Sequence, residues 1–360
     1  MHIPDGYLSP STCAALYAGA IAGWYAALKR LKRLLLSRVV PLISVFAAFA
    51  FVVMMFNLPL PGGTTGHAIG VTIAAIVLGP SGAILAISIA LAIQALFFGD
   101  GGVTTLGANC FNMAIVGSLV AYASYRLIAA GASIASKRRI AAAAIAGYLA
   151  VNAAAFVAAI EFGIQPLLFH DARGTPLYAP YPFRVALTAM MIGHLTFAGL
   201  AEAAIAAGLV AYLQVADPAL LQGASGLLVS REYVPAASCT AASSPRRLWL
   251  AVALLMLLTP LGILAAGQAW SEWSPSEFAR SGSPAQTAAA TTDLTAGIPA
   301  GMQRLANLWT APFPAYAPGF VKSSAFGYLL SAMFGVGFLL SLSLLVQRYL
   351  ERRRATRYSA

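Results

Sequence analysis

The stretch HAIGVTIAAIVLGPSGAILAISIALAIQALFF, residues 67–98, decides the fold class because it contains no Asp, Glu, Lys or Arg. A helix needs about 20 apolar residues to cross a bilayer. We predict two membrane spans here, His67–Leu78 and Gly82–Phe98. The first is short for a full span. We therefore expect it to begin from a loop already sunk within the protein, where irregular backbone is sheltered.

The whole chain has the composition of an integral membrane protein. Of its 360 residues, 60% are hydrophobic and 9% are charged, and the mean hydropathy is +0.79. Soluble domains carry about 25% charged residues. Disorder, fibrous structure and a secreted disulfide scaffold are excluded, and Cys13, Cys110 and Cys239 have no CxxC spacing. The first residues lack the basic region of a signal peptide, so we expect the mature chain to begin at Met1.

Further apolar segments bring the prediction to about nine spans in an all-α, polytopic membrane protein. Strand alternation is absent, which argues against a β-barrel. We predict a seven-span substrate-binding module at 1–216, a polar cytoplasmic linker at 217–246 and a two-span hairpin at 247–360 whose outer segment is 267–323. The remaining predicted spans are Ser11–Leu28, Pro41–Phe56, Gly107–Leu127, Ile140–Ile160, Val185–Leu213, Leu248–Ala266 and Ser324–Val346.

The net charge of +11 follows from loops on one side of these spans. Most Lys and Arg residues lie there, which predicts an N-terminus outside and a cytoplasmic C-terminus in a bacterial or archaeal membrane. Acidic residues fall mostly on the outer side, where they would attract cations weakly. Loop charges that only set topology explain the same pattern. The outer acidic residues are Asp5, Asp100, Glu161, Asp171, Glu272, Glu277 and Asp293.

The N-terminus offers a metal chelate. The amine of Met1, the amide nitrogen of His2 and the His2 imidazole can bind one ion through two fused rings. Such nitrogen donors suit square-planar Ni(II) or Cu(II), whereas Zn(II) prefers tetrahedral sites. His67, after the glycine-rich run Pro61–Gly66, can supply a fourth nitrogen from the same side. The alternative is that His2 is an incidental exposed residue and His67 a polar group at a helix start.

A resemblance to a known family bears on this choice. MHIPDGYL at residues 1–8 resembles the start of the substrate-specific M component of nickel and cobalt energy-coupling-factor transporters, and GGTTGH at 62–67 resembles its metal loop. The likeness covers about residues 1–215. It continues through LGP at 78–80, QALFFGDGG at 94–102, LGANCFNM at 106–113, GH at 193–194 and GLAE at 199–202.

The resemblance implies that Met1, His2 and His67 bind the metal. Asp100 could orient a metal-bound histidine, or it could be a turn residue. Asn109 and Asn112 resemble family positions near the site, although helix packing is the alternative. The implied cargo is Ni²⁺, with Co²⁺ next, and the implied partners are a transmembrane energy-coupling protein and cytoplasmic ATPases. The chain itself has no P-loop motif, no His-Glu-x-x-His motif and no implied cofactor.

Several alternatives stay open. Cobalt uptake for cobalamin biosynthesis is one, a membrane-embedded hydrolase using His194 and Glu202 is another, and a metal sensor or scaffold is a third. A structural role for Glu202 is favoured over a proton-carrying one. The C-terminal hairpin resembles the family's N component, with an eroded acidic motif at Ser274–Phe278. Ala15, Gly19 and Gly23 suit either a docking face for a partner subunit or internal packing.

Overall fold

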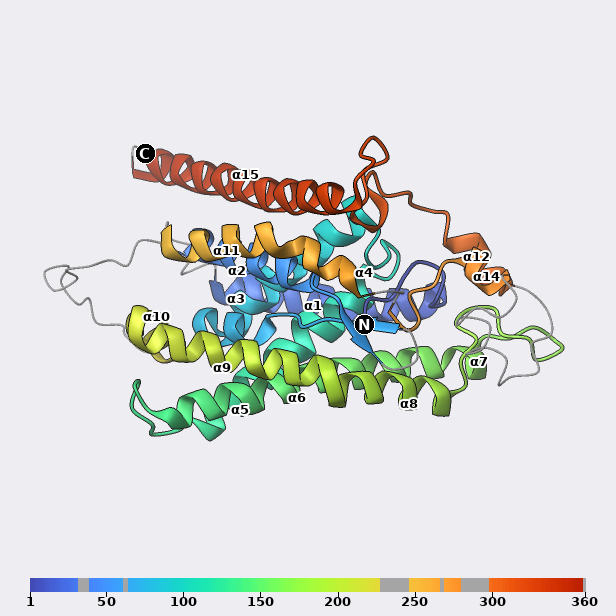
Figure 1. Ribbon diagram of the computed structural model, residues 1–360, viewed down its shortest axis with the longest axis horizontal. Helices are drawn as coiled ribbons and strands as arrows, with labels where there is room; N and C mark the ends of the chain where they lie inside the picture. The colour runs from blue at the N-terminus through green and yellow to red at the C-terminus, as the bar shows by residue number, and fades with distance from the viewer. Residues whose placement is uncertain (32–38, 61–63, 227–245, 266–268, 280–297, 359–360) are drawn as a thin grey trace, which may run out of the picture.

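The computed structural model describes residues 1–31, 39–60, 64–226, 246–265, 269–279 and 298–358. Long helices lie side by side along the longest axis of the molecule (Figure 1). The predicted all-α, polytopic fold is confirmed. Most of the predicted linker, part of the predicted outer segment, Gly62, Gly63 and Cys239 lie outside the described residues.

The helical stretches follow the predicted apolar segments, and several contain a π-helical turn. In chain order the elements are α1 (Pro10–Leu31), α2 (Val39–Met54), β1 (Leu58–Leu60), β2 (Thr64–Gly66), α3 (Val71–Ile93), η1 (Gln94–Phe98), α4 (Leu106–Asn109), η2 (Cys110–Val116), α5 (Gly117–Ile128), α6 (Lys137–Gly163), α7 (Gln165–Leu168), α8 (Phe183–Gly193), η3 (His194–Ala198), α9 (Gly199–Ala216), α10 (Pro218–Gly226), α11 (Arg246–Leu258), η5 (Thr259–Leu264), α12 (Pro275–Ala279), α14 (Ala300–Leu305), η6 (Pro314–Tyr316) and α15 (Ser324–Tyr358).

Within the described residues, five helical stretches are long and apolar enough to cross a membrane. This count is lower than the prediction of about nine. Two predicted spans form the shorter apolar helices Val39–Met54 and Leu248–Leu264. The predicted span in α1 is not among the five long apolar stretches. Two other predicted spans merge into Val71–Phe98. The five stretches are Val71–Phe98, Leu106–Ile128, Lys137–Leu168, Phe183–Ala216 and Ser324–Tyr349.

The merged stretch Val71–Phe98 reverses direction at Gly79. A straight helix of its 28 residues would be about 42 Å long. Yet His67, just before it, and Gly101, just after it, both lie beside His2. Gly79 has φ 71° and ψ 171°, a conformation open to glycine, and Pro80 follows it. The two predicted spans are therefore two arms of one broken helix.

The helix ends sort by charge. Figure 1 shows α10, the turn between α5 and α6 and the C-terminus at one end of the molecule, with α7, α12 and α14 at the other. The first end carries basic residues such as Arg126 and the run Lys137–Arg139. Glu161, counted above with the outer loops, instead lies buried in α6.

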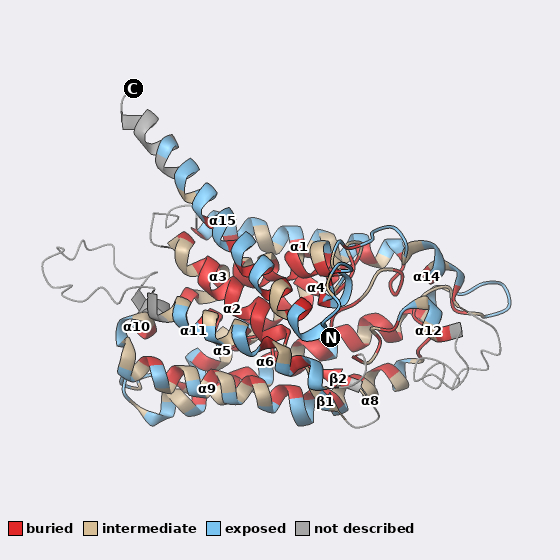
Figure 2. Ribbon diagram, turned by 45° about the horizontal axis from the view of Figure 1, so that its top comes forward, coloured by how far each residue is buried: buried red, intermediate tan, exposed pale blue. Residues whose placement is uncertain are grey.

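The small residues of α1 divide between two faces. An added Cβ at Gly19 would lie 3.1 Å from the Phe111 ring, and one at Gly23 would lie 2.3 Å from Ile115. These glycines therefore serve packing against η2. Ala15 is exposed instead (Figure 2 shows burial along the helices).

A segment between α11 and α15, here called the connector (residues 269–279 and 298–323), covers the N-terminus. Ala269 forms a parallel bridge with Thr65 of β2, which pairs antiparallel with β1. Phe313 N donates to Phe97 O at 2.9 Å, and an added Cβ at Gly6 would lie 2.6 Å from Met302 O. The C-terminal part of the chain thus packs directly on its first residues.

Candidate metal centre

The first residues are threaded into the protein as an extended segment. Ile3 N donates to Asn109 Oδ1 at 2.8 Å, and Ile3 O accepts from Asn109 Nδ2 at 3.1 Å and from Gly102 N at 2.9 Å. The Thr105 hydroxyl also donates to Ile3 O. Asn109 therefore fixes the backbone beside His2, which is how it lies near the predicted site.

Asp5 and Tyr7 hold the next part of this segment. The Asp5 carboxylate accepts from Val103 N at 3.0 Å and Thr104 N at 2.7 Å. Tyr7 Oη donates to Trp273 O of the connector at 2.7 Å. An added Cβ at Gly102 would lie 2.4 Å from Asp5 N, so this close approach requires glycine. The N-terminus is consequently gripped from both sides.

This threading brings His2 and His67 together. Their ring centroids are 5.0 Å apart, and the residues are 1% and 5% exposed. His67 Nδ1 lies 3.0 Å from Ala68 O. Among the described residues, His2 Nδ1, His2 Nε2 and His67 Nε2 have no hydrogen-bond partner. Buried polar atoms are rarely left unsatisfied in proteins, so three such nitrogens in one place indicate a ligand-binding role.

The backbone nitrogens of the predicted chelate meet a residue that sequence reasoning missed. The Met1 amine donates to Glu272 Oε1 at 2.9 Å, and His2 N donates to the same oxygen at 3.0 Å. Glu272 belongs to the connector, and only its place among the outer acidic residues marked it in the sequence. Its position between Trp270 and Trp273 offered no sign of this contact.

Asp100 and Asn112 occupy different surroundings. Asp100 Oδ1 lies 3.8 Å from His2 Nδ1, too far for a hydrogen bond, while its Oδ2 accepts from Gln94 Nε2 at 3.1 Å and from the Tyr316 hydroxyl. Asn112 Nδ2 instead donates to the buried Glu161 Oε2 at 2.7 Å. Asp100 thus borders the histidine pair, and Asn112 holds α6 to η2.

Burial sets the charge of the two histidines. It lowers the pKa of His2 from 6.5 to about 4, against the opposing effect of Glu272. It lowers the pKa of His67 to about 3, and the neighbouring His2 and the N-terminal ammonium lower it further. Both rings are therefore neutral at pH 7, the form that binds metal ions.

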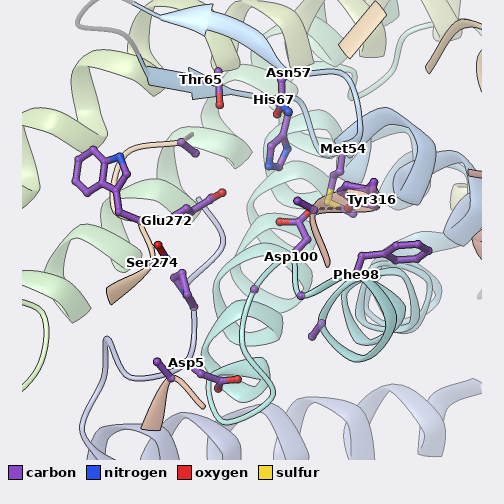
Figure 3. Close-up of a pocket in the computed structure, with 18 of the residues that line it drawn as sticks. Asp5, Met54, Asn57, Thr65, His67, Phe98, Asp100, Glu272, Ser274 and Tyr316 are labelled. Atoms are coloured by element: carbon purple, nitrogen blue, oxygen red, sulfur yellow. Dashed lines mark hydrogen bonds between the residues drawn. The ribbon is translucent and has the colours of Figure 1, made fainter. Parts of the chain in front are cut away.

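A cavity of about 400 Å³ opens beside the pair. Figure 3 shows His67, Asp100 and Glu272 around it, reaching in from the β2–α3 junction, the loop after η1 and the connector. Within the described residues no group of three or more His, Cys, Asp or Glu side chains could hold a metal ion.

The remaining candidates do not form a catalytic pair. Glu202 Oε2 accepts from Ile69 N at 2.9 Å and Gly70 N at 2.8 Å, and its Oε1 accepts from Thr72 N at 3.1 Å. His194 Nδ1 lies 2.7 Å from Met190 O. Glu202 therefore caps the buried start of α3, where a carboxylate suits the helix dipole, and does not act as a base for His194.

Replacing Glu202 by Ala is expected to destabilise the protein strongly. Three backbone N–H groups would lose their acceptor in a fully buried place, at a cost of about 3 kcal/mol or more. Glu202→Gln keeps one amide oxygen and should cost less. Thermal unfolding in detergent measures both variants. Equal unfolding temperatures for wild type and Glu202→Ala would contradict the capping role.

The chain is similar to several known proteins. The family described as "Cobalt uptake substrate-specific transmembrane region" matches residues 2–220. The chain is 51% identical over 343 residues, 95% of each chain, to the fused nickel transport protein NikMN of Rhodobacter capsulatus. It is 38% identical to the probable fused nickel transport protein LarMN of Lactiplantibacillus plantarum, over 93% of this chain and 94% of the relative.

A solved structure is similar as well. The crystal structure of a transition metal transporter shares 48% identity and a TM-score of 0.58, covering 64% of this chain and all of that chain. The similarity to the two fused relatives, unlike that to the solved structure, extends over nearly the whole length of the chain.

Proposed function

The chain belongs to the cobalt uptake substrate-specific transmembrane family, and we propose that it captures Ni²⁺, and next Co²⁺, for uptake across the cytoplasmic membrane. One observation carries the proposal: the buried rings of His2 and His67 have centroids 5.0 Å apart, and three of their nitrogens have no hydrogen-bond partner in the part of the chain that the structure describes. The Met1 amine and His2 amide lie beside them. The protein acts as a non-catalytic subunit, as the names of its transport-protein relatives support.

The donor set suits nickel and copper alike, and the names of the relatives favour nickel. The Met1 amine, the His2 amide, the His2 imidazole and His67 supply four nitrogens, and such a set suits a square-planar ion. Ni²⁺ and Cu²⁺ both accept this geometry, whereas Zn²⁺ prefers a tetrahedron. Relatives named as nickel transport proteins over nearly the full chain support nickel, and relatives named as cobalt transport proteins match shorter stretches.

Separate subunits supply the energy in this proposal. A transmembrane coupling protein and cytoplasmic ATPases would drive reorientation and inward release, because the chain contains no P-loop. The N-terminus faces outside and the C-terminus the cytoplasm. The gathering of Arg126, Lys137–Arg139 and the C-terminus at one end of the molecule supports this orientation.

Ni²⁺ binding by the purified chain, with its start at Met1 verified by mass spectrometry, tests the proposal. One ion per chain is expected, with the absorption spectrum of a square-planar nitrogen site. His67→Ala should weaken binding by roughly a hundredfold, since one of four ligands is lost. His170→Ala is the matched control, because His170 is exposed and its ring nitrogen Nδ1 lies 3.0 Å from Asp171 O. Equal losses in both variants would contradict a role for His67.

Proton release gives an independent test. The lowered pKa values, about 4 for His2 and about 3 for His67, keep both rings neutral above about pH 5, so each ring offers one nitrogen without a proton. Only the amine and the amide then give up protons on binding. We expect about two protons per Ni²⁺ at pH 6, against about 3.5 if both rings had ordinary pKa values. Calorimetry in buffers of different ionisation enthalpy measures the number.

The number of protons released on binding also determines how Ni²⁺ affinity depends on pH. Two released protons predict that affinity falls by about a hundredfold for each pH unit between pH 7 and pH 5. Metal binding and uptake therefore weaken as pH falls. Affinity that stays constant from pH 5 to 8 would rule out the amine and the amide as ligands.

A further inference from the structure

We propose that Glu272 is a placeholder at the metal centre: its carboxylate holds the Met1 amine and the His2 amide in the metal-free protein, and an arriving ion displaces it. This inference rests on the proposed function and extends it to the C-terminal part of the chain. It assigns a role to the connector, which approaches the metal centre through this carboxylate.

The hydrogen-bond geometry identifies the contact as a competitor of the metal. A single oxygen, Glu272 Oε1, accepts from both nitrogens, at 2.9 and 3.0 Å. An N–H bond points along the direction of the electron pair that remains when the proton leaves. The one N–H bond of the His2 amide, and one of the three N–H bonds of the Met1 ammonium, therefore point toward Oε1 along directions that could bind Ni²⁺. The ion and the carboxylate oxygen cannot occupy these directions together.

The backbone before Glu272 holds its side chain toward the N-terminus. Ser271 has φ 66°, in the left-handed region that non-glycine residues rarely adopt, and it is fully buried. Such strained residues persist where the surrounding structure holds them, often at functional sites. Here the bridge from Ala269 to Thr65 and the hydrogen bond from Tyr7 to Trp273 O fix the segment on either side.

Aromatic packing adds to this fixation. The ring centroids of Trp270 and Tyr181 are 4.6 Å apart, and those of Phe278 and Tyr7 are 6.3 Å apart. The Glu272 side chain itself is 19% exposed beside the cavity, so it has room to swing away. A firm backbone with a movable carboxylate is what a displaceable partner needs.

Displacement has two consequences. Apparent Ni²⁺ affinity is reduced by the fraction of molecules in which the carboxylate holds the nitrogens. Weakly coordinating cations that cannot replace these hydrogen bonds are excluded. In addition, metal loading removes one contact between the N-terminus and the connector, so the C-terminal part of the chain senses whether the site is filled.

Two variants test the proposal in the full chain. Glu272→Asp keeps the charge but withdraws the carboxylate by one methylene, and Glu272→Ala removes the acceptor. Glu277→Gln is the matched control, because Glu277 lies on the same segment and accepts from Ser274 N at 2.8 Å. Ni²⁺ affinity is measured by calorimetry, and unfolding temperature is measured with and without Ni²⁺.

The proposal predicts that Glu272→Asp binds Ni²⁺ roughly tenfold more tightly than wild type. A gain of this size corresponds to a carboxylate that holds the two nitrogens in about nine tenths of the metal-free wild-type molecules. Glu272→Ala gains less, because it also loses a charge that attracts cations. Both variants unfold at a lower temperature than wild type without metal. With Ni²⁺, Glu272→Asp unfolds at the wild-type temperature, and Glu272→Ala unfolds closer to it than without metal. Glu277→Gln leaves the affinity unchanged.

Two results would overturn the placeholder role. Weaker Ni²⁺ binding in Glu272→Asp and Glu272→Ala would make Glu272 a ligand of the bound ion. Equal destabilisation with and without Ni²⁺, at unchanged affinity, would make it a purely structural contact. His2→Ala, measured alongside, separates these failures from failure of the chelate: if it binds Ni²⁺ like wild type, the proposed function fails whatever Glu272 does.

Discussion

Adding two residues in front of Met1 is expected to abolish tight Ni²⁺ binding while leaving every side chain of the chain unchanged. The extension turns the Met1 amine into an amide and moves the histidine to position 4, which breaks the pair of fused chelate rings. One added residue would not serve, because a histidine at position 3 forms a new chelate with the amine and two amide nitrogens. Met1 is also only 4% exposed, so the added residues must enter the space beside Glu272. We expect a loss of at least a thousandfold in affinity, measured by calorimetry.

A removable leader supplies the control. The extended chain should regain full affinity once a protease restores the start at Met1, which shows that the extended protein is folded. Thermal unfolding of the extended, metal-free chain checks that its fold survives the lost contact with Glu272. Binding of unchanged strength and spectrum by the extended chain would eliminate the N-terminal chelate.

The apolar segments predicted the membrane fold well, because hydropathy over some 20 residues is a local property. The short segment His67–Leu78 was expected to start from a sunken loop, and Val71 does begin a helix whose first N–H groups Glu202 caps inside the protein. The reversal at Gly79 was less visible. A Gly-Pro pair marks a break, but the direction in which the chain continues depends on tertiary packing.

The residues of the metal centre were likewise only partly predictable from the sequence. His2 and His67 stood out because their residue types and positions in the sequence indicate nitrogen ligands without any knowledge of the fold. Glu272 did not, because its role depends on a contact with Met1, which lies 271 positions away in the sequence. Asn112 shows the reverse case: its neighbourhood in the sequence suggested the metal centre, while its side chain turns to Glu161.

His2→Ala is expected to weaken Ni²⁺ binding more than His67→Ala does. His2 closes the second chelate ring, so its loss breaks the tridentate unit, whereas loss of His67 leaves that unit intact with one open position. We expect at least a thousandfold loss for His2→Ala against roughly a hundredfold for His67→Ala. Calorimetry on both variants, with the metal-free unfolding temperature as a check on folding, gives the order.

His194→Ala serves as the control for His2→Ala, because His194 is also buried but its ring contacts Met190 O in the helical stretch from α8 to α9. His194 lines a cavity together with Met1, so the variant controls for a buried histidine near the amine that lies outside the proposed ligand set. It should bind Ni²⁺ like wild type. Full binding by His2→Ala together with loss in His194→Ala would move the metal centre to the helical stretch and revive the hydrolase alternative. If His67→Ala instead lost more Ni²⁺ affinity than His2→Ala, His67 would be the main ligand. The N-terminus would then only close over an ion that His67 already holds.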